Sequence, residues 1–413
     1  MNDIAIYTLT SELHDASTVK AETEQFLSSL GLTYQLCSTD FSDYGQHPLD
    51  LIFVRTGGTE SIFRRLLPTI SAQSPGRPIY LLASHKNNSL AASIEILSYL
   101  QLHGMRGEII HGTPDYVCQR IQRLQQVNEA HARLKGMRLG IIGTPSDWLI
   151  ASQADPTIVA ERWGIELVEL PIQEVQERFN TLSTSTNEEW DEICNRKGMP
   201  QLLSTPTTQV SNNIPDALRI YHALKEMVND YRLNGLTLRC FDLLGTLRNT
   251  GCLALSLLNS EGVIASCEGD VPAMISMAIA QALTRQTGFQ ANPASIDPHT
   301  GEVWFAHCTI PFDMVKRFAL DTHFESGIGV GIRGIMPNGP VTIFKTSTNE
   351  QRHYAAEGML TDSPSLPNLC RTQQVIRLSH PDDATYFLTH PIGNHHIILA
   401  GHHKALLDEM MNA

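Results

Sequence analysis

The sequence predicts a mixed α/β protein with two α/β domains and a β-rich C-terminal part. Strand-like and helix-like segments alternate over residues 1–136, as expected for parallel strands joined by crossover helices. The alternation restarts at Met137, and beyond residue 320 short β-rich runs follow one another, which is typical of an antiparallel unit or small barrel. We therefore expect domains at 1–136, 137–320 and 321–413, a number that suits 413 residues.

The first domain shows five β-rich runs with amphipathic segments between them. The strand-like runs are IAIYTL, LTYQLC, LDLIFVRT, PIYLLAS and GEIIHG. The stretch from Arg55 to Glu60, RTGGTE, follows one of these strands and opens a helix. Its glycines would let backbone amides approach a ligand oxygen, although a Gly-Gly pair also serves turn geometry alone.

The second domain continues the pattern and leads to an acidic motif. We expect a strand and loop in RLGIIGTPSDWLIAS, an exposed polar loop or lid over 182–213, and a helix over 217–233. The run LTLRCFDLL predicts a strand that ends at Asp242. Two further strands are expected at Cys252–Leu258 and Val263–Cys267, separated by a tight turn.

Glu268 and Asp270 follow the last of these strands. Asp270, Val271 and Pro272 predict a helix start, with the apolar run 273–283 behind them. In an extended chain both carboxylates point to one side, at the strand end where open α/β sheets place ligand chemistry. Carboxylate oxygens suit Mn²⁺ or Mg²⁺. Asp270 also fits a plain helix cap, and Glu268 a solvated strand end.

Histidines and arginines supply the other candidate site residues. His307 lies in the apolar strand VWFAHCTIP and fits a satisfied core histidine. His395 and His396 are neighbours at a turn-to-strand boundary, so at most one of them faces a given site. Arg239 and Arg371 lie in apolar segments, where an arginine needs a carboxylate or an anionic ligand. A structural ion pair and a substrate contact both satisfy that need.

The C-terminal runs predict strands at HFESGIGVGIRGIM, VTIFKTS, HYAAEGMLT, CRTQQVIRL, ATYFLTHPIG and HHIILAG, and FQANPASID before them predicts a loop.

Composition and charge exclude several classes of function. The net charge of −13 argues against nucleic-acid or anionic-membrane partners. No apolar run is long enough to cross a bilayer, and the N-terminus has no signal-peptide pattern. The eight cysteines form no CxxC pair. With GxSxG, P-loop, HExxH and GxGxxG motifs also missing, we expect a cytoplasmic protein outside the commonest hydrolase, NTPase and dehydrogenase classes.

Four segments together resemble the L-fucose isomerase family and its more distant L-arabinose isomerase relatives. They are LNSEG-VIASCEGDVPAMISM, FQANPASID, AHCTIPFDM and GNHHIILAG, within about Arg239 to Gly401. The resemblance implies two Rossmann-like α/β domains followed by a β-barrel. It also implies a divalent metal, usually Mn²⁺ (or Mg²⁺ or Co²⁺), and an aldose–ketose interconversion through an ene-diol. By position, Asp270 and His395 would be metal ligands, and Glu268, a further candidate ligand, would position a ligand or carry a proton.

One part of the family pattern is missing. Fucose isomerases carry a further acid, as ligand and base, on the strand before the E-x-D motif, and CLALSLLN has none. We expect Asp242 or Glu325 to replace it. Arg239 and Arg371 leave room for a sulfonated, phosphorylated or carboxylated sugar.

Further candidate substrate contacts are His307, Glu325, Asn394, His396 and Arg55. Relatives assemble with shared active sites, so we expect a homo-oligomer, a trimer or hexamer, whose N-terminal domain covers a neighbour's site. Two alternatives remain open. A metal-dependent sugar lyase or aldolase would use the same kind of intermediate, and a sugar-binding protein would keep the fold without the base.

Overall fold

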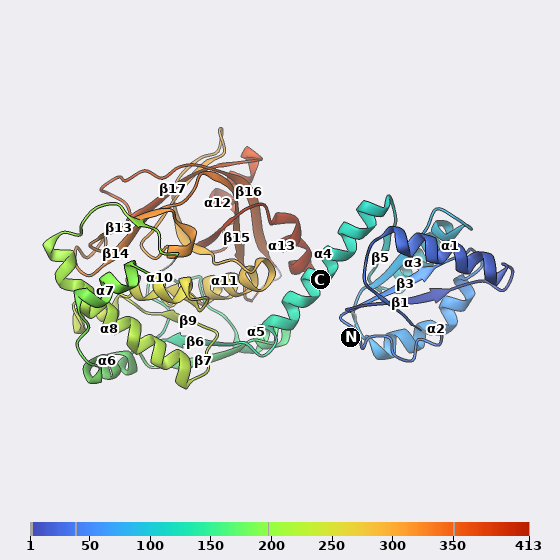
Figure 1. Cartoon of the computed structure of the whole chain (residues 1–413), viewed down its shortest axis with the longest axis horizontal. Coiled ribbons are helices and arrows are strands. Elements are labelled where there is room, and N and C mark those ends of the chain that lie inside the picture. Colours follow the sequence, from blue (N-terminus) through green and yellow to red (C-terminus); the bar gives the residue numbers. More distant parts are fainter. Residues whose placement is uncertain (1–2, 38, 197, 350–351, 413) are drawn as a thin grey trace. The chain divides into compact units, whose positions relative to one another are not determined.

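The computed structural model describes residues 3–37, 39–196, 198–349 and 352–412 (Figure 1). The chain divides after Ala130 into two compact units. The helix α4 (Pro114–Leu134) runs through this division point. No helix in the described ranges is long and apolar enough to cross a membrane.

The first unit is a parallel sheet between two layers of helices. Its strand order is β2-β1-β3-β4-β5. The strands are β1 (Ile4–Leu9), β2 (Gln35–Leu36), β3 (Leu49–Val54), β4 (Ile79–Ala83) and β5 (Gly107–Ile110). Helices α1 (Ala16–Ser29) and α4 pack on one face, and α2 (Glu60–Gln73) and α3 (Ser89–Leu102) on the other. Coverage of both faces explains why every residue of β1 and β3 is buried.

The second unit begins with a four-stranded parallel sheet of order β10-β9-β6-β7. Its strands are β6 (Arg138–Ile142), β7 (Glu166–Leu170), β9 (Gly235–Leu238) and β10 (Ile264–Cys267). The accompanying helices are α5 (Pro156–Trp163), α6 (Ile172–Thr181), α7 (Asn187–Cys194), α8 (Thr208–Asp230), α9 (Asp242–Thr246), α10 (Cys252–Ser260) and α11 (Val271–Thr284). The expected α/β class, with parallel sheets, is confirmed.

A closed antiparallel barrel follows in the same unit, with the order β11-β12-β17-β16-β15-β18. Its strands are β11 (Phe289–Asp297), β12 (Glu302–His307), β15 (Gly339–Thr346), β16 (His353–Asp362), β17 (Thr372–Leu378) and β18 (His396–Ala400). The barrel thus takes two strands from before residue 321. A small sheet pairs β13 (Arg317–Asp321) with β14 (Gly331–Ile335) and β8 (Gln201–Leu202), and α12 (Thr385–Thr389) and α13 (Lys404–Asn412) complete the fold.

Two predicted element types were wrong around the acidic motif. The run Cys252–Leu258 is the helix α10 instead of a strand, because a short, wholly buried apolar segment carries no periodicity that separates the two. FQANPASID is the strand β11 instead of a loop. It accommodates Pro293 because the register of its pairing with β12 shifts there, as at a β-bulge.

Three other segments also differ from the prediction. Residues 182–213 contain α7, β8 and the start of α8 in place of a single loop, with Thr186 and Thr207 capping the helices. The segment ATYFLTHPIG contains the short helix α12 instead of a strand. The strand β9 ends at Leu238, so Asp242 is the first residue of α9.

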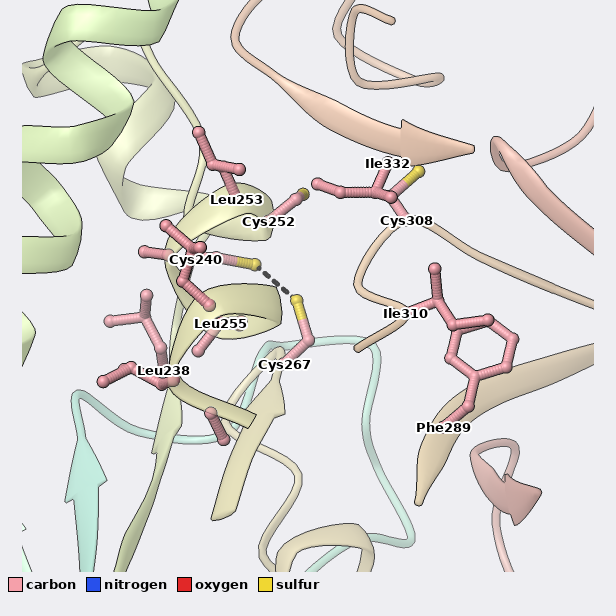
Figure 2. Packing of buried hydrophobic residues seen from close by; sticks show 14 of the residues in the cluster. Leu238, Cys240, Cys252, Leu253, Leu255, Cys267, Phe289, Cys308, Ile310 and Ile332 are labelled. Atoms are coloured by element: carbon pink, nitrogen blue, oxygen red, sulfur yellow. Dashed lines mark hydrogen bonds between the residues drawn. The ribbon is translucent and has the colours of Figure 1, made fainter. Parts of the chain in front are cut away.

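Buried thiols form part of the core beneath the acidic motif (Figure 2). Cys240 Sγ and Cys267 Sγ are 3.1 Å apart, a contact longer than the disulfide bond length of about 2.05 Å. They pack as small hydrophobic side chains beside Leu238 and Leu255, in a buried cluster that also includes Phe289. Because Cys267 directly precedes Glu268, this packing fixes the backbone from which the acidic motif projects.

Candidate active site

The site is built on a strained turn at the end of β10. Glu268 has a φ of 65°, in the left-handed region that few residues with side chains adopt, and Gly269 follows at 71°. A Cβ on Gly269 would lie 2.6 Å from Thr144 O, so glycine is required there. Ser146 N donates to Glu268 O at 2.9 Å, and Gly269 N donates to Leu238 O at 3.0 Å. Strain of this kind at a buried carboxylate is typical of functional sites.

Glu268 meets two histidines from the barrel. Glu268 Oε1 lies 3.6 Å from His307 Nε2, at the end of β12, and 3.4 Å from His395 Nε2, just before β18. All three side chains are buried, and their ligand atoms form a group able to hold a metal ion. Ligands about 2.1 Å from a tetrahedral metal are about 3.4 Å apart, so the spacing fits.

Hydrogen bonds orient both imidazoles toward Glu268. Asp270 Oδ2 bonds His395 Nδ1 at 2.8 Å, and Thr309 Oγ1 bonds His307 Nδ1 at 2.9 Å. Each histidine therefore turns its Nε2 toward the shared space, and His395 Nε2 is buried without a hydrogen-bond partner. Metal-binding histidines are held in this way by a partner on the other ring nitrogen. Trp148 Nε1 donates to Glu268 Oε2 at 2.7 Å and holds the carboxylate.

The charges of the cluster are strongly coupled. Burial alone would raise the pKa of Glu268, but His395 and His307 hold it well below its usual range. Burial lowers the pKa of His395, yet Glu268 and Asp270 together raise it to about 9. Burial lowers the pKa of His307. Both carboxylates are therefore ionised, and a bound metal ion would have to displace the proton that they stabilise on His395.

Asp270 caps a helix, which was one of its two expected roles, and it also orients His395. Its Oδ1 accepts from Ala273 N at 2.7 Å and caps α11, while its Oδ2 holds His395. Lys345 Nζ lies 3.6 Å from Asp270 Oδ1, and the lysine is 1% exposed. Burial would raise the pKa of Asp270, but Lys345 and His395 lower it to about 2. Asp270 therefore contacts the ring nitrogen of His395 that faces away from Glu268, and Lys345 compensates the negative charge of Asp270.

Further residues near the acidic motif were not predicted from the sequence. Trp148, Phe241 and His323 form an aromatic row, with ring centroids 4.8 Å and 5.3 Å apart. Burial lowers the pKa of His323 to about 4, and the imidazole is neutral. Lys345 carried a usable signal, since a lysine in the apolar run VTIFKTS requires a carboxylate partner. Trp148 and His323 carried no such signal, because the local sequence does not show which loop residues will come into contact in the fold.

Glu325 lies in the turn between β13 and β14. Its side chain is exposed at the surface. Partial burial raises its pKa, and the negative charge of Glu268 raises it further. Glu325 is outside the buried cluster of Glu268, His307 and His395.

Arg239 and Asp242 form the structural ion pair that the sequence left as an alternative. Arg239 Nε bonds both Asp242 carboxylate oxygens at 3.0 Å, and Nη2 bonds Asp147 at 3.0 Å. Arg371 is anchored differently, with Nε donating to Thr322 O at 2.7 Å. Its nearest carboxylate, Asp321, is 3.7 Å away.

His396 and Asn394 frame His395 without entering the cluster. His396 points to the opposite side of β18, as expected, and lies in an aromatic group with Tyr354, Tyr386 and Phe387. Its Nδ1 donates to Asn394 O at 3.0 Å, and Tyr386 OH donates to its Nε2 at 3.0 Å. Asn394 Oδ1 accepts from His395 N at 2.9 Å. Arg55 lies in the first unit, directly after β3.

The buried His396 predicts a pH-dependent stability. Burial lowers its pKa from 6.5 to about 3, so between these pH values the unfolded chain binds the extra proton. The free energy of unfolding therefore falls as pH falls below 6.5, by about 1.4 kcal/mol per unit from this group. Between pH 6.5 and pH 5 we expect the free energy of unfolding, measured by urea unfolding, to fall by about 2 kcal/mol less in His396→Phe than in the wild type. The exposed His299, changed to Asn, is the control, and equal slopes for His396→Phe and wild type would contradict the prediction.

No protein-family model matches the chain. A sulfoquinovose isomerase of Clostridium sp. (strain MSTE9) is 24% identical over 269 residues, covering 64% of this chain and 58% of that protein. A sulfoquinovose isomerase of Priestia aryabhattai is 23% identical, covering 63% and 59%, and that of Alkalicoccus urumqiensis is 21% identical, covering 62% and 59%. The chain thus spans less than two thirds of the length of these relatives. Its distant homologues are sugar isomerases, while membership of the fucose isomerase family itself is not supported.

Proposed function

We propose that this chain is an enzyme that interconverts the aldose and ketose forms of a sulfonated monosaccharide. The observation that carries the proposal is the buried group of Glu268, His307 and His395, with ligand atoms 3.4 Å and 3.6 Å apart. The relatives named sulfoquinovose isomerase support the substrate class. Because the match covers about three fifths of their length, the activity and substrate remain proposals for this chain.

In this proposal Glu268, His307 and His395 hold a divalent metal. Two imidazole nitrogens and one carboxylate suit Mn²⁺ or Co²⁺, and the unpartnered His395 Nε2 fits a ligand position. Asp270, expected from the sequence to be a ligand, becomes the residue that orients His395. When bound, such an ion would neutralise negative charge that develops on two adjacent sugar oxygens.

Proton transfer requires a carboxylate near the sugar carbons. Glu325 is our candidate, because it lies two residues after His323, whose ring packs against Phe241, and because burial and the charge of Glu268 raise its pKa. It would take the proton from one sugar carbon and return it to the neighbouring carbon, while the hydroxyl proton of the second carbon passes to the oxygen of the first, so that substrate and product have equal mass. Asp242 is a weaker candidate because Arg239 holds both of its oxygens.

Arg371 is the better of the two expected arginines for contact with a sulfonate. Arg239 is saturated by Asp242 and Asp147, whereas the carboxylate nearest to Arg371 is beyond hydrogen-bond distance. The two parallel sheets and the closed barrel support the proposed plan of two Rossmann-like domains and a barrel. We also propose that the protein forms a homo-oligomer whose active sites are shared between subunits.

A substrate panel with added Mn²⁺ tests the proposal. We expect sulfoquinovose to yield a ketose of equal mass, and Arg371→Met to raise KM about tenfold or more for it while changing KM little for the sugar without a sulfonate. The exposed Arg377→Met is the matched control. Two smaller products would instead indicate a lyase. Thermal stabilisation by the sugar without turnover under any metal would indicate a binding protein.

A further inference from the structure

The first unit contains a cavity at the carboxyl edge of its sheet. The strand order β2-β1-β3-β4-β5 places a switch point between β1 and β3, because the chain leaves these two strands in opposite directions. Open α/β sheets bind ligands beside such a point, outside the carboxyl ends of the strands. A cavity of about 210 Å³ lies at this edge, between α1 and the ends of β3 and β4. This is far above the ~10–15 Å³ of such space that a single water needs, so an inorganic oxyanion fits.

Arg55 is the unexplained charge in this cavity. It follows β3 on the same face as Phe53, and both line the cavity. Its Nε is buried without a hydrogen-bond partner, and no carboxylate in the described ranges pairs with its guanidinium. Burial lowers the pKa of Arg55, with no acid opposing the shift. A half-buried arginine of this kind costs stability unless an anion neutralises it.

A second orphan polar atom lies on the neighbouring strand. Thr10 Oγ1, just past the end of β1, is buried without a hydrogen-bond partner. Ile4 and Ile6 face α1 and α4, so by strand alternation Thr10 lies on the same face as Arg55. Arg55 N donates to Leu9 O at 3.0 Å and keeps the two strand ends together.

The cavity wall is positively charged and held in place. Lys86 and Arg55 contribute cations, and Glu22 is the acid among the lining residues, with Lys86 Nζ 3.3 Å from its Oε1. Asn87 has a φ of 52°, and its O accepts from Gly57 N at 2.7 Å, so the loop after β4 is fastened to the loop after β3. The arrangement leaves one uncompensated positive charge in a preformed site.

We propose that this cavity binds an oxyanion, a phosphate or sulfonate group, through Arg55 with Lys86 beside it. The inference concerns the first unit and does not rest on the function proposed for the second. Bidentate contact from a guanidinium is the strongest side-chain mode for such a group.

Titration calorimetry with inorganic phosphate and sulfate at constant ionic strength tests the proposal. We expect saturable binding with one site per chain, weakened 10- to 100-fold in Arg55→Gln. Arg64→Gln removes an equal charge from the exposed side of α2, on the opposite face of the sheet, and is the matched control. Lys86→Gln should weaken binding less than Arg55→Gln. Affinity unchanged in Arg55→Gln, or equal loss in Arg64→Gln, overturns the proposal.

Two further measurements distinguish anion binding by Arg55 from a purely structural role, and the cavity from the site at Glu268. In anion-free buffer Arg55→Gln should not lower the melting temperature of the protein, because the side chain has no partner to lose; a lower value together with unchanged anion binding overturns the proposal. Repeating the titration in Glu268→Gln separates the two sites, since the cavity should bind phosphate equally well even if the isomerase proposal fails. Tighter binding of a sulfonated sugar than of phosphate to Glu268→Gln, lost with Arg55→Gln, would identify the sugar as the source of the oxyanion. Tighter binding of phosphate than of the sulfonated sugar would identify free phosphate as the source of the oxyanion.

Discussion

Glu268→Gln is expected to abolish divalent-metal binding and to lower turnover of the sugar by about 10³-fold or more. The substitution keeps the shape of the side chain and leaves an oxygen able to accept from Trp148 Nε1, which now donates at 2.7 Å. It removes the negative charge that faces His307 and His395. A metal held by three protein ligands loses its only anionic one, and several kcal/mol of charge stabilisation go with it.

Metal content of protein purified without chelator, measured by mass spectrometry, checks this expectation. About one ion per chain in the wild type and none in Glu268→Gln is the expected result. Glu302 accepts from Trp304 Nε1 at 2.9 Å, so Glu302→Gln removes a similar carboxylate–indole pair at the other end of β12 and should keep the metal. A full complement of metal in Glu268→Gln would remove this residue from the ligand set.

Asp270→Asn is expected to destabilise the second unit by about 3–5 kcal/mol. Asparagine caps helices as well as aspartate does, so the cap on α11 survives. The substitution removes the negative charge that faces Lys345. The lysine is 1% exposed, and its Nζ lies 3.6 Å from Asp270 Oδ1. Removing one partner of a buried pair leaves an uncompensated charge, which is the costly outcome. Neutralising both groups in Asp270→Asn/Lys345→Met should recover much of the stability.

Urea unfolding followed by tryptophan fluorescence measures this effect in the right unit, since all four tryptophans lie beyond Ala130. Asp155 caps α5 by accepting from Thr157 N at 2.8 Å and is exposed, so Asp155→Asn is the control and should cost about 1 kcal/mol or less. If Asp270→Asn lost no more stability than Asp155→Asn, Asp270 would be a helix cap and nothing more.

The local sequence anticipated those features of the site that depend on neighbours in the chain. Asp270 before Val-Pro predicted a capped helix, and α11 begins there with Asp270 as its cap. The adjacent His395 and His396 were expected to face opposite sides, and they do, one toward Asp270 and one toward Tyr386. Alternation along a strand and capping at a helix start are properties of a few consecutive residues.

Other features were decided by contacts between distant segments. His307 fitted a core histidine, but the barrel brings its Nε2 to 3.6 Å from Glu268. Arg239 was a candidate for an anionic ligand, and the fold gives it Asp242 and Asp147 instead. Burial on every side removed the periodicity of Cys252–Leu258, so its helix could not be told from a strand.

By itself the sequence determined the α/β class, the parallel sheets, the β-rich end and the acidic turn, because periodicity and capping are encoded locally. Only the tertiary structure decided that Glu268 meets His307 and His395, that Asp270 stands behind His395 with Lys345, and that Arg55 is left without a partner. These residues come from separate elements, and the pairing of strands into a sheet and a closed barrel sets which of their charges meet. Burial at that point then fixes the charge each group carries.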